Sequence, residues 1–283
     1  MAFSNSLDLA KTTFDVIKKD KELLLFPLIG VFLSCGWIAA MIVPFWMLYV
    51  DGNPETYEAG VVDIILTFIL YLGLAFIATF TKFCVTYTSK TRFEGGDATF
   101  GESIKFTLGQ THLVLGWATI SATVGLFFLF LDNLAEKAGA VGEIIIGIIR
   151  SLLGMAWAAI NLFVVPAMIY EQVGPMDAIK TSGQVLKKTW GEAIVKHFGL
   201  GFIAFGFYML GGLLTWGLAQ VFNDGNLIWI TIGFATLYFS FTALLFSVAD
   251  SVFNTALYAY AATGKVPEGW SEATMMGAFK QKD

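Results

Sequence analysis

The sequence predicts an all-α membrane protein, a bundle of six transmembrane helices with both termini in the cytoplasm. Three observations predict it. The chain of 283 residues is 57% hydrophobic and only 14% charged, whereas soluble domains carry about 25% charged residues. Six apolar runs are long enough to cross a bilayer, which takes about 20 residues. Basic residues gather in the connections on one side of these runs.

The apolar runs define the expected spans. They are 23–49, 61–88, 113–131, 144–170, 194–221 and 227–262. The last run is longer than a straight crossing needs, so we expect it to tilt or to continue into the aqueous side. Of the 17 Lys and Arg residues, only Lys137 and Arg150 fall on the side expected to be external. The excess of positive charge on the other side predicts a multi-pass protein of the cell membrane with cytoplasmic N- and C-termini.

A short pattern, [DE]-x-x-K-x-[ST], occurs three times, each time before an odd-numbered span. Its lysines are Lys11, Lys105 and Lys180. Apolar residues at helical spacing surround them, which is typical of amphipathic helices lying on a membrane face. We therefore expect three surface helices on the cytoplasmic side.

These surface helices suggest an internal repeat. The single membrane domain, 1–283, divides into 1–93, 94–172 and 173–283, each a surface helix followed by a hairpin of two spans. Because every unit begins and ends on the same side, the repeats are expected to be parallel rather than inverted.

The acid of each pattern has a structural explanation. It stands three residues after a residue that can cap a helix; the caps are Asn5, Thr99 and Gly174, and the acids are Asp8, Glu102 and Asp177. A carboxylate at this position can accept a hydrogen bond from the backbone of the cap and faces the positive end of the helix dipole. We expect capping rather than ligand binding from these acids.

The lysines near the surface helices are candidates for contact with anionic lipid headgroups. Their ammonium groups can extend to phosphates from an interfacial helix. The candidates are Lys11, Lys18, Lys19, Lys105, Lys180, Lys187 and Lys188.

Few polar or charged residues lie within the spans, and such residues are costly in a bilayer unless they are paired. Lys82 and Asp250 lie at comparable depth in the second and sixth spans, with Asn254 one turn beyond Asp250. They are expected either to form an ion pair that holds the bundle together or to line a polar site for an ion or a headgroup. Arg150 is expected to pair with an acid near the outer face, and Asn161 is the deepest amide.

No catalytic, metal-binding or nucleotide-binding motif is present in the sequence. There are two histidines, His112 and His197, each placed where a span begins, and two cysteines, Cys35 and Cys84, inside apolar runs. We expect the cysteines to be buried small hydrophobic residues. The sequence therefore predicts a non-enzymatic protein without a cofactor, a metal or a nucleic-acid partner.

Two stretches carry a resemblance to known proteins: "VIKKDKELLLFPLIG" (16–30), with Pro27 early in the first span, and "PMDAIKTSGQVLKKTWGEA" (175–193) before the fifth. With its layout, the chain resembles a family of six-span prokaryotic membrane proteins, mainly archaeal, of unknown function. It is distantly similar to the membrane-anchor domain found beside some glycerophosphodiester phosphodiesterases. The resemblance implies no activity and transfers no functional residues.

We therefore expect a lipid-interacting scaffold or an accessory subunit of a membrane complex, with membrane lipids and other membrane subunits or further copies of itself as partners. The alternative is a small transporter or channel whose polar path runs between the three hairpins. An enzyme acting on lipids, with a pocket on the cytoplasmic side, is a third possibility.

Overall fold

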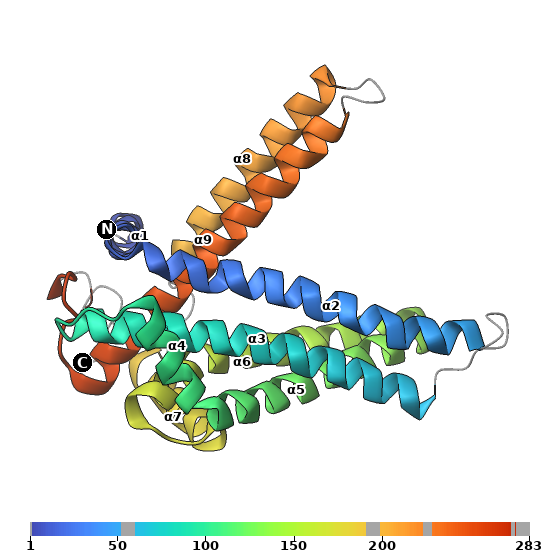
Figure 1. Cartoon of the computed structure of the whole chain (residues 1–283), viewed down its shortest axis with the longest axis horizontal. Helices are drawn as coiled ribbons and strands as arrows, with labels where there is room; N and C mark the ends of the chain where they lie inside the picture. Colours follow the sequence, from blue (N-terminus) through green and yellow to red (C-terminus); the bar gives the residue numbers. More distant parts are fainter. Residues whose placement is uncertain (1, 52–59, 191–198, 223–227, 273–274, 276–283) are drawn as a thin grey trace.

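The computed structural model describes residues 2–51, 60–190, 199–222, 228–272 and 275. These residues form helices and their connections, without strands, which confirms the all-α prediction (Figure 1). The helices are α1 (Ala2–Lys19), α2 (Leu25–Asp51), α3 (Val61–Phe93), α4 (Phe100–Gly109), α5 (Thr111–Lys137), α6 (Gly139–Glu171), α7 (Pro175–Trp190), α8 (Gly199–Val221) and α9 (Ile228–Thr263), with the short 3-10 helix η1 (Lys21–Leu24) before α2.

Six of these helices are long and apolar enough to span a membrane, as predicted. They are α2, α3, α5, α6, α8 and α9. The expected start of the fifth span, near 194, lies outside the described residues. The second helix of each hairpin is longer than the first: α3, α6 and α9 have 33, 33 and 36 residues, against 27, 27 and 23 for α2, α5 and α8. At a rise of about 1.5 Å per residue, the longer helices extend past their partners at one end.

The main hydrophobic core lies where the C-terminal ends of α3, α6 and α9 meet. Phe83, Phe163 and Tyr258, one from each helix, are fully buried there. The rest of the bundle instead exposes large apolar side chains; Phe32 of α2 is 70% exposed and Leu237 of α9 is 75% exposed. Exposed apolar surface of this extent fits contact with lipid tails better than contact with water.

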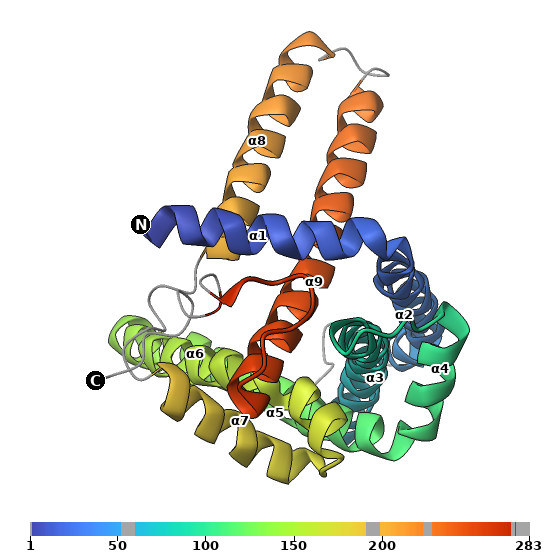
Figure 2. The same cartoon turned by 90° about the vertical axis from the view of Figure 1, so that its left-hand side faces the viewer.

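The short helices α1, α4 and α7 surround this core. α4 packs on α3, α7 packs on α6, and α1 packs on α9 and α8. Figure 2 shows α1 crossing α9 while α4 and α7 lie at the edge of the same end of the bundle. Each short helix therefore packs against a hairpin other than the one that follows it in the sequence. α4 packs on the first hairpin, α7 on the second and α1 on the third.

One predicted cap is wrong. α1 begins at Ala2, so Asn5 lies inside the helix rather than at its N-terminus. The apolar periodicity continues upstream of Asn5 through Phe3, and helix propagation past an Asn costs little compared with starting a new helix.

The hairpin of α8 and α9 diverges from the other spans (Figure 1). Within α9, the stretch from Val248 to Ala259 is largely buried, whereas the half nearer Ile228 is mostly exposed. α9 is thus one continuous helix with two environments. Its C-terminal half forms part of the core, and its N-terminal half packs on α8 through Tyr238 and Phe239. This accounts for the length of the last apolar run.

Candidate functional site

The predicted headgroup lysines lie on the exposed faces of the short helices. Lys11, Lys18, Lys19, Lys105, Lys180 and Lys187 are all exposed. The side chain of Lys188 lies outside the described residues. Lys180 Nζ donates to Oδ1 of Asp177, one turn earlier, at 2.9 Å. Both side chains of that pair are more than half exposed, so the pair is weak and leaves the lysine accessible.

The Ser or Thr of the repeated pattern is buried on all three helices. Thr13, Thr107 and Ser182 are each 0% exposed. Ser182 Oγ donates to the carbonyl oxygen of Ile160 in α6 at 2.6 Å, and Thr107 Oγ1 accepts from the thiol of Cys84 in α3 at 3.3 Å. The hydroxyl thus anchors α7 to α6 and α4 to α3, while the lysine two residues earlier points outward. The sequence pattern combines an inner contact with an outer charge.

Of the two cysteines, only one is buried as expected. Cys84 is fully buried against α4, but Cys35 is exposed on α2. The prediction for Cys35 was wrong because an apolar run in a membrane protein does not distinguish a core face from a lipid face.

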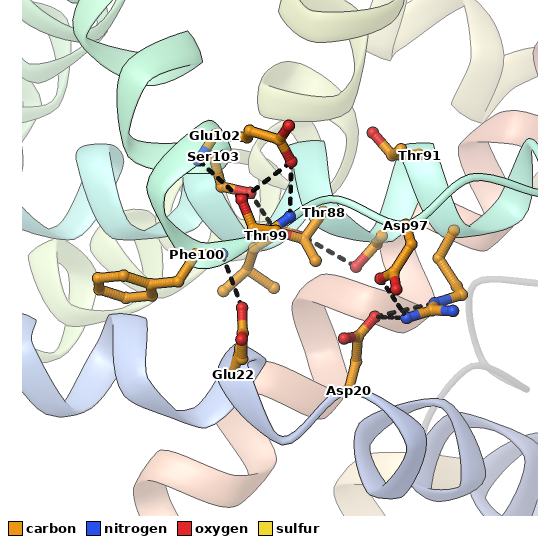
Figure 3. Close-up of polar contacts among 12 residues, drawn as sticks. Asp20, Glu22, Thr88, Thr91, Asp97, Thr99, Phe100, Glu102 and Ser103 are labelled. Carbon is orange, nitrogen blue, oxygen red and sulfur yellow. Dashed lines mark hydrogen bonds and ion pairs between the residues drawn. The ribbon is translucent and has the colours of Figure 1, made fainter.

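The N-terminus of α4 confirms the predicted capping box (Figure 3). The backbone N–H and the hydroxyl of Thr99 donate to the Glu102 carboxylate at 2.8 and 2.9 Å, and the N–H of Glu102 donates back to the Thr99 hydroxyl. The next N–H, of Phe100, donates to Glu22 of η1 at 2.6 Å. Two carboxylates therefore accept from the N–H groups of Thr99 and Phe100 at this helix end, and Glu22 links α4 to the first hairpin.

These bonds predict a pH dependence. Donation by the Thr99 backbone and hydroxyl lowers the pKa of Glu102 below its usual value. A lowered folded-state pKa contributes stability at neutral pH that is lost as the pH falls through that pKa. Glu102→Gln, which cannot titrate, is expected to be less stable than wild type at pH 7 and equal to it once Glu102 is protonated. Thermal unfolding in a neutral detergent at pH 7 and at pH 3 measures this; parallel losses in both proteins would contradict it.

Arg92, at the end of α3, contacts two acidic residues that lie before η1 and before α4 and are labelled in Figure 3, Asp20 and Asp97. Its guanidinium lies 2.8 Å from Asp20, between α1 and η1, and 2.8 Å from Asp97, in the segment leading to α4. The side chain of Asp20 is only 9% exposed, whereas that of Asp97 is 77% exposed. The sequence identified Arg92 only as one of many basic residues on this side.

The charged residues predicted inside the membrane are only partly brought together. Lys82 and Asp250 line one cavity of about 220 Å³ between α2, α3 and α9, with Thr81, Ser247 and Ser251. The Asn254 amide donates to the Asp250 carboxylate at 2.9 Å. In the part of the chain that the structure describes, no direct ion pair joins Lys82 to Asp250. The two charges therefore face one cavity without direct contact, and a polar site for an ion or a headgroup stays a prediction.

The other two residues lie apart from this cavity. Arg150 forms an ion pair with Asp132 of α5, at the end of the bundle away from the core. Asn161 donates to the carbonyl oxygen of Trp157 in its own helix at 3.1 Å. Arg150 thus links α6 to α5 through an acid, as predicted, and the Asn161 amide bonds within its own helix.

A further polar cluster, not predicted, lies where α3, α6 and α9 converge. The Tyr258 hydroxyl donates to the Glu171 carboxylate, the Tyr170 and Tyr258 rings lie 5.5 Å apart, and the ammonium of Lys90 lies 5.2 Å from the Tyr170 ring. Glu171 also accepts from Thr181 of α7. The only sequence signal was the Tyr-Glu pair that ends the fourth span. The contacts come from three distant segments, so spacing along the chain could not reveal them.

No group of three or more His, Cys, Asp or Glu side chains is arranged to hold a metal ion among the described residues. His112 stands alone at the start of α5, and His197 lies outside the described residues.

A comparison with family models matches residues 61–268 to a family described as "Family of unknown function (DUF6159)". No curated protein matches the chain. The matched region contains α3 to α9 and more than half of the chain.

Proposed function

The chain belongs to this family of unknown function, and we propose that it is a non-enzymatic membrane scaffold whose surface helices bind anionic lipid headgroups. One observation carries the proposal. On each of three helices around one end of the bundle, a lysine is exposed and the hydroxyl residue two positions later is buried in the core: Lys11 with Thr13, Lys105 with Thr107, and Lys180 with Ser182. The buried hydroxyls orient the helices, and the lysines form a belt of positive charge.

We further propose that the chain is a parallel triplicate, with units 1–93, 94–172 and 173–283. The order of elements supports this proposal, because each unit has a short surface helix, then a shorter span and then a longer span. Each surface helix packs on the long helix of the preceding unit, and α1 packs on α9 of the last. In a cyclic arrangement of this kind, every unit buries its surface helix against a neighbour, so no unit is complete by itself.

The side bearing the surface helices is proposed to be cytoplasmic. The sequence bias of Lys and Arg supports this orientation. The anionic inner leaflet attracts each nearby basic residue by about 1 kcal/mol. Binding of headgroups along the belt would orient the protein and recruit anionic lipid around it. This role is compatible with service as an accessory subunit of a membrane complex.

The test removes the belt without touching the core. In the triple variant Lys11→Gln, Lys105→Gln and Lys180→Gln, the preference for anionic over neutral lipid is expected to fall by about fivefold per lysine, because 1 kcal/mol corresponds to about that factor. Lipid that co-purifies with the protein from nanodiscs of mixed composition measures the preference. The matched control is Lys137→Gln, an exposed lysine at the other end of the bundle. An unchanged lipid ratio in the triple variant would overturn the proposal.

The alternative, a transporter or channel, would need Lys82, Asp250, Asn161 and Arg150 along one path. Only the first two share a cavity, while Arg150 is paired with Asp132 and Asn161 with its own helix. The geometry of the described residues therefore favours the scaffold. A flux assay in sealed vesicles would separate the two functions.

A further inference from the structure

The cavity lined by Lys82 and Asp250 has an unusual charge arrangement for a site near the membrane. It carries one cation and one anion, with three hydroxyl residues among its other walls. Asp250 is exposed and accepts one hydrogen bond, from Asn254. Lys82 is half-buried and makes no direct hydrogen bond or ion pair among the described residues, so the charges of Lys82 and Asp250 interact only through space. A half-buried ammonium that no acceptor contacts directly is unfavourable near a membrane. A ligand with both charges would satisfy Lys82 and Asp250 together.

The depth of the cavity matches the headgroup region. Phe14 of the surface helix α1 packs edge-on against Phe246 of α9, with ring centroids 5.8 Å apart. Asp250 lies one helical turn beyond Phe246, toward the core end, and Pro27 of the cavity wall lies in the first turn of α2. An amphipathic helix such as α1 lies at the boundary between headgroups and acyl chains. With α1 at that boundary, as proposed above, the cavity would lie at the level of the phosphates rather than of the bilayer centre.

Apolar surface continues from the cavity toward the other end of the bundle. Leu28, Val31 and Phe32, in the turns of α2 that follow Pro27, are 39%, 44% and 70% exposed. α2 and the α8–α9 hairpin diverge in this direction (Figure 1). A molecule that places a polar group in the cavity can thus keep acyl chains against α2, which is the geometry of a membrane lipid and not of a soluble metabolite.

We propose that this cavity binds the headgroup of a phospholipid with a primary amine, with the phosphate near Lys82 and the ammonium near Asp250. Thr81 of α3 and Ser247 of α9 add hydroxyl groups to the lining of the cavity. A quaternary amine has no N–H to donate to Asp250, and a purely anionic headgroup leaves Asp250 without a cation. The site therefore selects among lipids of similar size. The inference uses the proposed function only for the depth of α1.

The first experiment uses the wild-type full chain, so it does not depend on a variant that folds. The delipidated protein in a neutral detergent is incubated with equimolar phosphatidylethanolamine, phosphatidylcholine and phosphatidylglycerol, and bound lipid is counted by native mass spectrometry. Phosphatidylethanolamine is expected to occupy one tight site about tenfold more strongly than either other lipid, the factor that about 1.4 kcal/mol provides. Soluble phosphoethanolamine is not expected to displace it. Equal occupancy by the three lipids would overturn the proposal, and so would displacement by phosphoethanolamine.

Substitutions of Asp250 and Lys82 test which part of the headgroup each residue binds. Asp250→Asn is expected to remove the preference for phosphatidylethanolamine over phosphatidylcholine while binding of the phosphate persists. Lys82→Gln is expected to weaken all three lipids. Lys137→Gln and Glu143→Gln, exposed charges at the other end, serve as matched controls. If both cavity variants destabilise the delipidated protein but leave lipid selection unchanged, the two residues form a structural pair and the site is excluded.

This test is separable from that of the lysine belt. The belt variant should keep the preference for the primary amine, and the cavity variants should keep the preference for anionic lipid in nanodiscs. An anionic preference that persists in the belt variant would contradict the belt alone, and a primary-amine preference that persists in Asp250→Asn would contradict the cavity site alone.

Discussion

Replacing Arg92 by methionine is expected to lower the free energy of unfolding by about 2–3 kcal/mol. Removing one partner of a largely buried ion pair leaves the other charge desolvated and unpaired. Here that charge is Asp20, whose side chain is only 9% exposed and whose Oδ2 accepts from both Nε and Nη2 of Arg92. We place the effect below that of a fully buried pair because Arg92 itself is 29% exposed. Lysine at this position cannot form both bonds and should recover only part of the loss.

The other partner of Arg92 provides the control. Asp97 lies at the same distance from the guanidinium, but its side chain is 77% exposed. Asp97→Asn is therefore expected to cost less than about 1 kcal/mol. Denaturation of the purified protein in mixed micelles, followed by circular dichroism, measures both. Equal effects of the two substitutions would mean that burial of Asp20 is not what gives the contact its strength.

Substitution of Gly211 by alanine is expected to cost about 1–3 kcal/mol, because it overpacks the contact between α8 and α9. A Cβ on Gly211 would lie 2.2 Å from Cε1 of the Tyr238 ring. The ring cannot move freely, since its hydroxyl donates to the carbonyl oxygen of Phe207 at 2.9 Å. The two helices would have to separate or that hydrogen bond would have to break.

The adjacent glycine is a matched control in the same helix. Gly212 is exposed, and a Cβ added there meets no atom within 4 Å. Gly212→Ala is expected to be neutral or slightly stabilising, since alanine favours a helix more than glycine does. Thermal unfolding of the two variants side by side is the measurement. A Gly212 variant as unstable as the Gly211 variant would show that glycine matters here for the helix backbone and not for the close approach.

The sequence predicted the six membrane-capable helices, the short helices before the odd-numbered spans and the capping box at Thr99 and Glu102. Each of these depends on residues near one another in the chain, through hydropathy, period and capping chemistry. The sequence also predicted that Lys82 and Asp250 lie near each other, because charged residues are rare in apolar runs and these two lie at comparable depth. Two predictions from the sequence were wrong: Asn5 does not cap α1, and Cys35 is not buried. In both cases the local sequence is compatible with more than one structural position.

The sequence by itself thus determined that the chain enters a membrane, and which segments do so, because transfer of a helix into lipid depends on its own length and composition. Only the tertiary structure decided that Arg92 meets Asp20, that Tyr258 meets Glu171, and that Lys82 and Asp250 share a cavity without pairing. These contacts depend on the rotation of each helix and on its choice of neighbours. Both are set by packing between segments distant in the chain, which hydropathy does not record.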